Sequence, residues 1–247
     1  MASDVYHSFV RARRTALALT AVAAAGLAVA GCGGGGSGSG SLSGMSAKQV
    51  VAKAVADLKS AKSFTMDGSV SQSGQTLGVD LGYRGGQGCQ GTVTEGTSGS
   101  IAIVVIGSTA WIKPSDQFLK AEEGSSAAQV ISVLKGRYLK GSTGNSNVKS
   151  LTAVCSVDSM TSSFTDTGTL TKGTVTTVDG QQVLPITDNT KGGTMYVTTS
   201  ATPQVVEISN TTGKGGSTGT INFNVGAQVT LTAPSASQTL DGSAFGF

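Results

Sequence analysis

The stretch that decides the fold class is "SFTMDGSVSQSGQTLGVDLGYR", Ser63 to Arg84. In its first half, Phe64, Met66 and Val70 alternate with polar side chains, and Ser73-Gly74 then marks a turn. The second half repeats the alternation, with Leu77, Val79, Leu81 and Tyr83. A period of two on both sides of a turn predicts an antiparallel hairpin with one apolar face.

Directly after the hairpin, "GQGCQG" at Gly86 to Gly91 has the letters of a dinucleotide-binding fingerprint. That fingerprint needs a helix at its last glycine, so that backbone N–H groups face a pyrophosphate, and an acidic residue about 20 positions later. Gly91 is instead followed by the strand-favouring Thr92-Val93-Thr94, and position 111 is Trp. The sequence predicts a hairpin turn that enters a strand, and no nucleotide site.

Further strands are predicted on both sides of a more helical region. The first set comprises 101–106 and 110–113, and the second covers "GTVTTVDGQQVLPIT", "GTMYVTTSATPQVVEIS" and "GTINFNVGAQVTLTA" after Phe164. Between them, 126–134 and 150–160 have helical character, with Gly136 as a stop signal for the first. The prediction is therefore an α+β fold with a helical insert at about 115–162.

A helix precedes the hairpin. Ser46 and Gln49 form an S-x-x-Q capping box, and the apolar residues that follow recur at three-to-four spacing, at Val50, Val51, Ala54, Val55, Leu58 and Ala61. We expect this helix to pack its apolar side against the sheet. The folded domain is therefore predicted to span 46–247.

The first 31 residues read as a lipoprotein signal peptide. Arg11, Arg13 and Arg14 precede an apolar run that is shorter than the roughly 20 residues of a membrane span, and the run ends in "VAGC". This order resembles the lipobox of bacterial lipoproteins, which implies that Cys32 is acylated and becomes the new N-terminus. An ordinary signal peptide or an uncleaved anchor is the alternative. Residues 32–45 would then be the acylated cysteine and a Gly/Ser-rich tether.

Removal of the leader changes the chemistry available to the protein. Three arginines and one aspartate leave with it, so the net charge falls from +3 to +1, and the only histidine, His7, is lost. Without histidine the commonest general base and zinc ligand are missing, and no basic stripe suggests nucleic acid. We expect no enzyme activity, no cofactor, no metal and no nucleic-acid partner.

After acylation of Cys32, two cysteines remain, Cys89 and Cys155. An even pair in an exported protein favours a disulfide, and two buried thiols are the alternative.

The best enzyme motif is S-x-x-K, which occurs at Ser132 to Lys135 and at Ser146 to Lys149. On a helix the lysine would lie one turn from the serine and could act as its base. Two matches are expected by chance in a serine-rich chain, and the S-D-N and K-T-G motifs of Ser-Lys hydrolases are missing.

The order of motifs resembles the LppX/LprG-type lipoproteins, which share the fold of LolA-like lipoprotein carriers. The likeness covers about Ser46 to Asp241 and rests, beside the lipobox and the first helix, on the segments "SFTMDGSV", "IGSTAWIKP", "FLK", "LKGRYLK", "TVDGQQVLPIT", "GTMYVTTSATPQVVEI" and "APSASQTLD". The resemblance implies a single, strongly curved antiparallel sheet, a half-barrel, with helices on its concave face. It also implies a cavity for acylated lipids between sheet and helices. The extra cysteine pair and the aromatic content of 5% depart from the family.

Together these observations predict a monomeric lipoprotein on the extracytoplasmic face of the cell membrane that carries an apolar or acylated ligand. The residues expected to line the ligand site are Met66, Val70, Leu77, Val79, Leu81, Ile103, Val105, Trp111 and Leu134. For Trp111, plain core packing is the alternative to a place at the cavity rim. The helices would act as a lid, with Gly124 and Gly136 as hinges. The alternative function is an envelope protein with a filled core that binds other proteins and no ligand.

Overall fold

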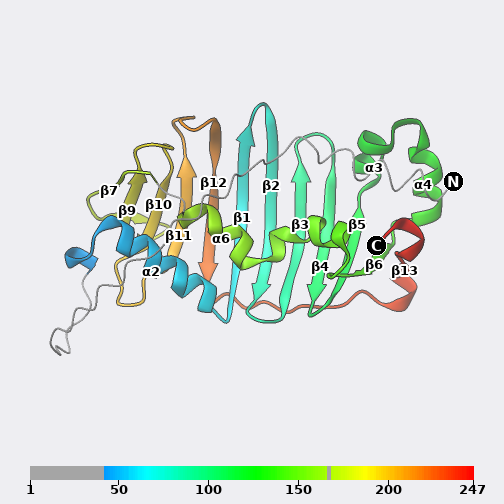
Figure 1. Cartoon of the computed structure of the whole chain (residues 1–247), viewed down its shortest axis with the longest axis horizontal. Coiled ribbons are helices and arrows are strands. Elements are labelled where there is room, and N and C mark those ends of the chain that lie inside the picture. Colours follow the sequence, from blue (N-terminus) through cyan, green and yellow to red (C-terminus); the bar gives the residue numbers. More distant parts are fainter. Residues whose placement is uncertain (1–41, 166–167) are drawn as a thin grey trace.

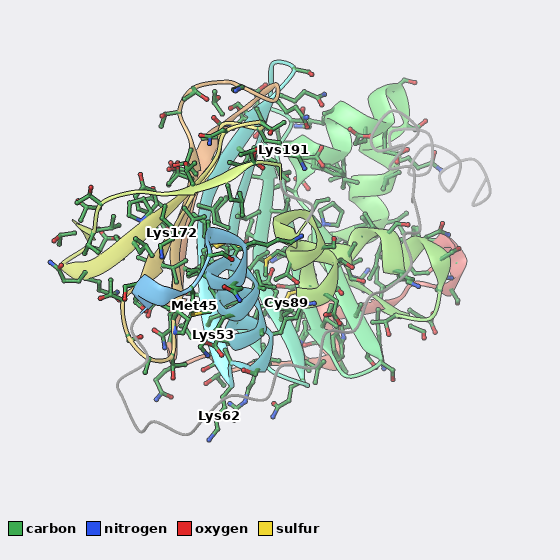
Figure 2. All side chains as sticks on the ribbon, turned by 60° about the vertical axis from the view of Figure 1, so that its left-hand side comes forward. Met45, Lys53, Lys62, Cys89, Lys172 and Lys191 are labelled. Atoms are coloured by element: carbon green, nitrogen blue, oxygen red, sulfur yellow. A yellow bond between two sulfur atoms is a disulfide. The ribbon has the colours of Figure 1, made fainter. Side chains whose placement is uncertain are left out.

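The chain is described by a computed structural model that covers residues 42–165 and 168–247. The signal peptide, Cys32 and most of the predicted tether lie outside these residues. The described part has one sheet of 13 strands in the order β13-β6-β5-β4-β3-β2-β1-β12-β11-β10-β9-β7, with β8 also paired to β9. Its strand pairs are antiparallel, except that β13 runs parallel to β6. The predicted α+β class, an unclosed curved sheet with helices on its concave face, is confirmed (Figures 1 and 2).

The strands follow one another mostly as neighbours in the sheet. Their bounds are β1 Ser63–Gln72, β2 Gln75–Arg84, β3 Gly88–Glu95, β4 Ser100–Ile106, β5 Thr109–Pro114, β6 Tyr138–Ser142, β7 Leu170–Lys172, β8 Thr176–Val178, β9 Gln181–Asp188, β10 Thr194–Thr198, β11 Val205–Asn210, β12 Ser217–Val225 and β13 Thr239–Asp241. The α-helices are α2 Ala47–Ser60, α3 Asp116–Glu123, α4 Ala127–Leu134, α5 Ser146–Leu151 and α6 Val157–Thr165. The short 3-10 helices are η1 Leu42–Gly44, η2 Gly124–Ser126, η3 Ala153–Cys155, η4 Ala236–Gln238 and η5 Ser243–Phe245.

The central hairpin has the register that its alternation predicts. Met66 pairs with Leu81, and Val70 pairs with Leu77 across β1 and β2. Ser73 and Gly74 both adopt a positive φ at the turn, as two-residue hairpin loops require. The prediction of an apolar hairpin face is confirmed.

Glycines inside strands β1, β3 and β12 allow the sheet to bend. Gly68, Gly91 and Gly219 have φ values of +139°, +150° and +147°, a conformation that only glycine adopts readily. A Cβ at any of them would overlap a carbonyl oxygen of the adjacent strand. The final glycine of "GQGCQG" therefore sits where the backbone of β3 approaches that of β2, and the hairpin interpretation of this motif is confirmed.

Helix α2 packs on the sheet as predicted. The Gln49 N–H donates to Ser46 Oγ at 3.3 Å, and the Ser46 N–H donates to Gln49 Oε1 at 2.8 Å, so the capping box forms. Val50 and Ala54 are fully buried against the sheet. This side of the helix closes the largest apolar cluster of the described residues.

The predicted helical insert is only partly helical. Tyr138–Ser142 forms strand β6, which pairs with β5 and so extends the sheet. Helix α4 ends where Gly136 predicts, whereas α3, whose N-cap is Ser115, was not predicted. On α4, Val130 and Leu134 are buried, whereas Val133 is 47% exposed.

The second predicted helix, 150–160, is broken into α5, η3 and α6. The break occurs at Ser156, whose hydroxyl accepts a hydrogen bond from the Ser159 N–H at 3.2 Å. Serine at this position starts a new helix and does not continue the old one, because its side chain satisfies a free N–H of the first turn.

The last residues of the predicted tether contact the folded domain. Leu42 is buried in the main apolar cluster, and the Lys172 ammonium donates to the carbonyl oxygens of Leu42, Ser43 and Met45 at 2.9, 3.1 and 2.7 Å. Figure 2 shows Lys172 and Met45 beside the start of α2. Residues 42–45, which the sequence assigns to the tether, are therefore held against the folded domain by a lysine distant in sequence.

Candidate functional site

The concave face is organised in four rows of side chains that cross the strands. The rows follow from the pairing register, because directly paired residues point to the same face. The lower row is Val225, Phe64, Tyr83, Cys89, Val105 and Ala110; the middle row is Phe223, Met66, Leu81, Gly91, Ile103 and Ile112; the upper row is Ile208, Ile221, Gly68, Val79, Val93 and Ile101; the rim row is Gly219, Val70, Leu77 and Glu95.

The lower and middle rows are filled. Met66, Leu81, Ile103 and Val105, four of the predicted lining residues, are 1–7% exposed and belong to apolar clusters that helices α2, α3 and α5 complete. These side chains contact protein in the described structure. They contribute to stability in the way of ordinary core residues.

The upper and rim rows are covered less completely. Val70, Val79, Val93 and Ile221 are half-buried, and Leu77 is 44% exposed. In Figure 1, α6 crosses the sheet at about mid-height, and the upper ends of β1 and β2 project beyond it. The result is an apolar strip on the concave side of the sheet that the described helices do not bury.

Glycine shapes this strip. Gly68 lies in the upper row between Ile221 and Val79, and Gly219 lies beside Val70 in the rim row. A Cβ at either glycine would overlap a carbonyl oxygen of the neighbouring strand, so the backbones approach closely there and the strip takes its apolar surface from the residues on either side. An extended hydrocarbon chain fits such a surface, because dispersion contacts require close approach along its length.

Two predicted lining residues lie elsewhere. Leu134 belongs to a separate cluster with Leu119, Val130 and Leu139 at the α3–α4 end of the sheet. Trp111 pairs with Val104 and so lies on the outer, convex face, opposite Ile112 and the rows. The prediction that Trp111 lines the concave site is therefore wrong, and its side chain is half-buried on the outer face.

A disulfide holds the helical cover against the lower row. Cys89 of β3 and Cys155 of η3 are joined, with their Cα atoms 5.3 Å apart. Beside them, the Tyr83 hydroxyl donates to the Val154 carbonyl oxygen at 2.7 Å, and burial raises the pKa of Tyr83, so this hydroxyl stays a donor at ordinary pH. The disulfide and this hydrogen bond therefore both attach η3 to the sheet at the same place.

The proposed hinges flank α4 and its preceding turn. Gly124 and Gly136 have φ values of +53° and +67°. Next to the first of them, Glu123 is buried and its Oε1 has no hydrogen-bond partner in the described structure. Burial, followed by the neighbouring Glu122, raises the pKa of Glu123. Motion at these hinges stays a prediction.

The S-x-x-K pairs do not form a hydrolase arrangement. The Ser132 hydroxyl donates to the Gln129 carbonyl oxygen at 2.7 Å, and Lys135 lies past the helix end in a left-handed conformation. Across residues 42–165 and 168–247, no group of three or more histidine, cysteine or acidic side chains is placed to hold a metal ion. The helices of those residues are also too short or too polar to cross a bilayer.

Sequence reasoning missed Val93 and Ile221 as members of the strip. Both were visible as alternating positions in "GTVTEG" and "GTINFNV". Which face of the sheet these two side chains point to could be assigned only through the register of β3 with β2 and of β12 with β1.

No family model and no curated protein matches this sequence. Among solved structures, LprF from Mycobacterium bovis is 12% identical, with a TM-score of 0.48 over 77% of this chain and 97% of that one. LppX from Mycobacterium tuberculosis is 11% identical, with a TM-score of 0.47 over 75% of this chain and 98% of that one. The MucA/MucB complex of Pseudomonas aeruginosa gives 14% identity and a TM-score of 0.33 over 80% of this chain and 62% of that one. The chain is thus similar to LprF and to the lipoprotein LppX, at low sequence identity.

Proposed function

We propose that this protein is an extracytoplasmic lipoprotein that binds an apolar or acylated ligand on the concave side of its sheet, without chemistry on that ligand. The observation that carries the proposal is the uncovered apolar strip formed by the upper and rim rows. Val70, Leu77 and Val79 of the predicted lining belong to it, and Val93 and Ile221 extend it to the neighbouring strands.

The energetic argument concerns exposed apolar area. Leu77 is one of three large hydrophobic side chains that are exposed among the described residues, and it is paired with the half-buried Val70. Burial of a leucine side chain stabilises a complex by about 1.5–3 kcal/mol. A hydrocarbon chain laid along the strip would bury Leu77 together with its neighbours. Without a ligand, this apolar surface stays in unfavourable contact with water.

Replacing Leu77 by aspartate is expected to weaken binding of a fluorescent fatty acid, cis-parinaric acid, at least about tenfold, because a carboxylate would replace the most exposed apolar side chain of the strip. The measurement is a fluorescence titration of the full chain. Since Leu77 is already 44% exposed, the substitution should leave the unfolding midpoint nearly unchanged.

Val133→Asp is the matched control. Val133 is 47% exposed on α4, away from the strip, so the same carboxylate there should leave the affinity intact. Equal affinities of both variants and the unchanged protein would place the fatty acid elsewhere. No uptake of the probe, combined with no lipid in native mass spectra of protein purified from its own envelope, would remove the carrier function.

The membrane anchor is the second part of the proposal. Cys32 follows the small residues of the lipobox, and two or more acyl chains give stable attachment where one gives marginal attachment. Cys32→Ala is expected to abolish incorporation of labelled palmitate and to shift the protein from the membrane to the soluble fraction. A variant that still incorporates the label would contradict the assignment of Cys32.

One observation favours the alternative function, a ligand-free envelope protein that binds other proteins. The lower and middle rows are packed by protein side chains, so a deep cavity does not underlie α2. The fatty-acid titration separates the two functions, since a protein-binding surface has no reason to take up the probe.

A further inference from the structure

The C-terminal segment crosses the outer face of the sheet as a strap, defined here as residues 226–238. Its start is fixed to β1, where the Ser63 hydroxyl donates to the Ala227 carbonyl oxygen at 2.7 Å. Val229 is buried against Gly82, and the Thr232 N–H donates to Gln90 Oε1 at 3.0 Å. Figure 1 shows the strap running along one end of the strands from β12 to β13.

Between strap and sheet lies an open groove of about 660 Å³, a size in the range of small-molecule sites. Its floor crosses the strands, because Asp80 pairs with Thr92, Thr92 with Ala102, and Ala102 with Lys113. Tyr138 of β6 also lines the groove. From β2 to β6 there are four strand spacings, so the floor is about 19 Å long.

The lining is polar, and part of it has no partner within the protein. The side chains of Thr65, Asp80 and Thr92 make no hydrogen bond to other described residues. Gln228 and Thr230 of the strap face the same groove. Hydroxyls and amides both donate and accept, and a carboxylate accepts two or more hydrogen bonds. This set matches a ligand that carries many hydroxyl groups.

An aromatic side chain, Tyr138, lines one end of the groove, with Lys113 Nζ 4.9 Å from the centroid of its ring. Trp111 lies on the same face of the sheet next to this lining, paired with Val104 and Lys140. Aromatic faces beside hydrogen-bonding side chains suit sugar rings, which have an apolar face and a polar edge. Apolar residues such as Ala102, Val104 and Val229 line the groove between the polar ones, which suits a ring with one apolar face.

We infer that the groove between the strap and the outer face of β2–β6 binds a neutral oligosaccharide. This site lies on the opposite side of the sheet from the apolar strip and does not depend on the proposed lipid function. The Asp80 carboxylate accepts hydrogen bonds from sugar hydroxyls, and the aromatic end supplies the stacking surface.

Trp111 provides the test, because it is the only tryptophan of the chain and reports on the outer face alone. The full chain is titrated with hexasaccharides of glucose, mannose and N-acetylglucosamine while tryptophan fluorescence is followed. We expect a saturable change with at least one sugar, and an affinity about tenfold lower in Asp80→Ala, since a charged hydrogen-bond partner is lost. Asp116→Ala, which removes an exposed carboxylate from α3, is the matched control and should bind like the unchanged protein.

Three outcomes would overturn the inference. One is the lack of a saturable change with all three sugars at millimolar concentration. Another is equal binding by Asp80→Ala and Asp116→Ala. The third is saturable binding of an extended Gly-Ser hexapeptide in place of the sugars, which would assign the groove to peptides. Leu77→Asp should retain sugar binding, so a failure of the lipid proposal is seen separately.

Discussion

Gly91→Ala is expected to lower the free energy of unfolding by about 4 kcal/mol, from backbone strain and overpacking of about 1–3 kcal/mol each. At φ +150°, an added Cβ would overlap the Asp80 carbonyl oxygen and approach the Leu81 Cα to 2.8 Å. Both atoms belong to the backbone of β2, so no side-chain rotation relieves the contact. Thermal unfolding followed by circular dichroism should show a midpoint lower by on the order of 10 °C.

Gly78→Ala is the control in the neighbouring strand. A Cβ there would meet the Thr94 Cβ at 3.6 Å, an ordinary van der Waals distance, and Gly78 has no positive φ. Alanine should be neutral or slightly stabilising at this position, because it restricts the unfolded chain. Equal midpoints for the two variants would mean that β3 and β2 separate readily at Gly91, contrary to the curvature argument.

Loss of the Cys89–Cys155 disulfide is the second large effect, and we expect it to cost about 4 kcal/mol for a closed loop with a sequence separation of 66. The bond joins the fully buried Cys89 of β3 to η3 between α5 and α6. Its removal should therefore loosen the cover over the lower row first. The measurement is the unfolding midpoint in urea with and without dithiothreitol, in a full chain that carries Cys32→Ala.

The double variant Cys89→Ala/Cys155→Ala should resemble the reduced protein and should not respond to dithiothreitol. This control separates loss of the cross-link from other effects of the reductant. Alkylation of both cysteines in protein never exposed to reductant, with an unchanged midpoint, would show that the exported chain keeps two thiols.

The sequence by itself determined the local elements of this protein. The alternation from Phe64 to Tyr83 and the turn at Ser73-Gly74 predicted the central hairpin, because a pleated strand places successive side chains on opposite faces. The capping box at Ser46 predicted where α2 begins. Both signals involve residues within a few positions of one another, and their physical causes are equally local.

Tertiary structure decided which apolar residues meet and which remain uncovered. Trp111 and Ile112 are neighbours in sequence, yet only the pairing of β5 with β4 and β6 puts Trp111 on the outer face and Ile112 under the helices. Leu77 and Leu81 share one face and one alternation, but Leu77 is 44% exposed, whereas Leu81 is buried in the main apolar cluster with residues of α2. The same applies to Lys172, which fixes residues 42–45, and to the strap that roofs the outer groove. These contacts join residues far apart in the chain, so no short-range pattern encodes them, and long-range packing alone sets their geometry.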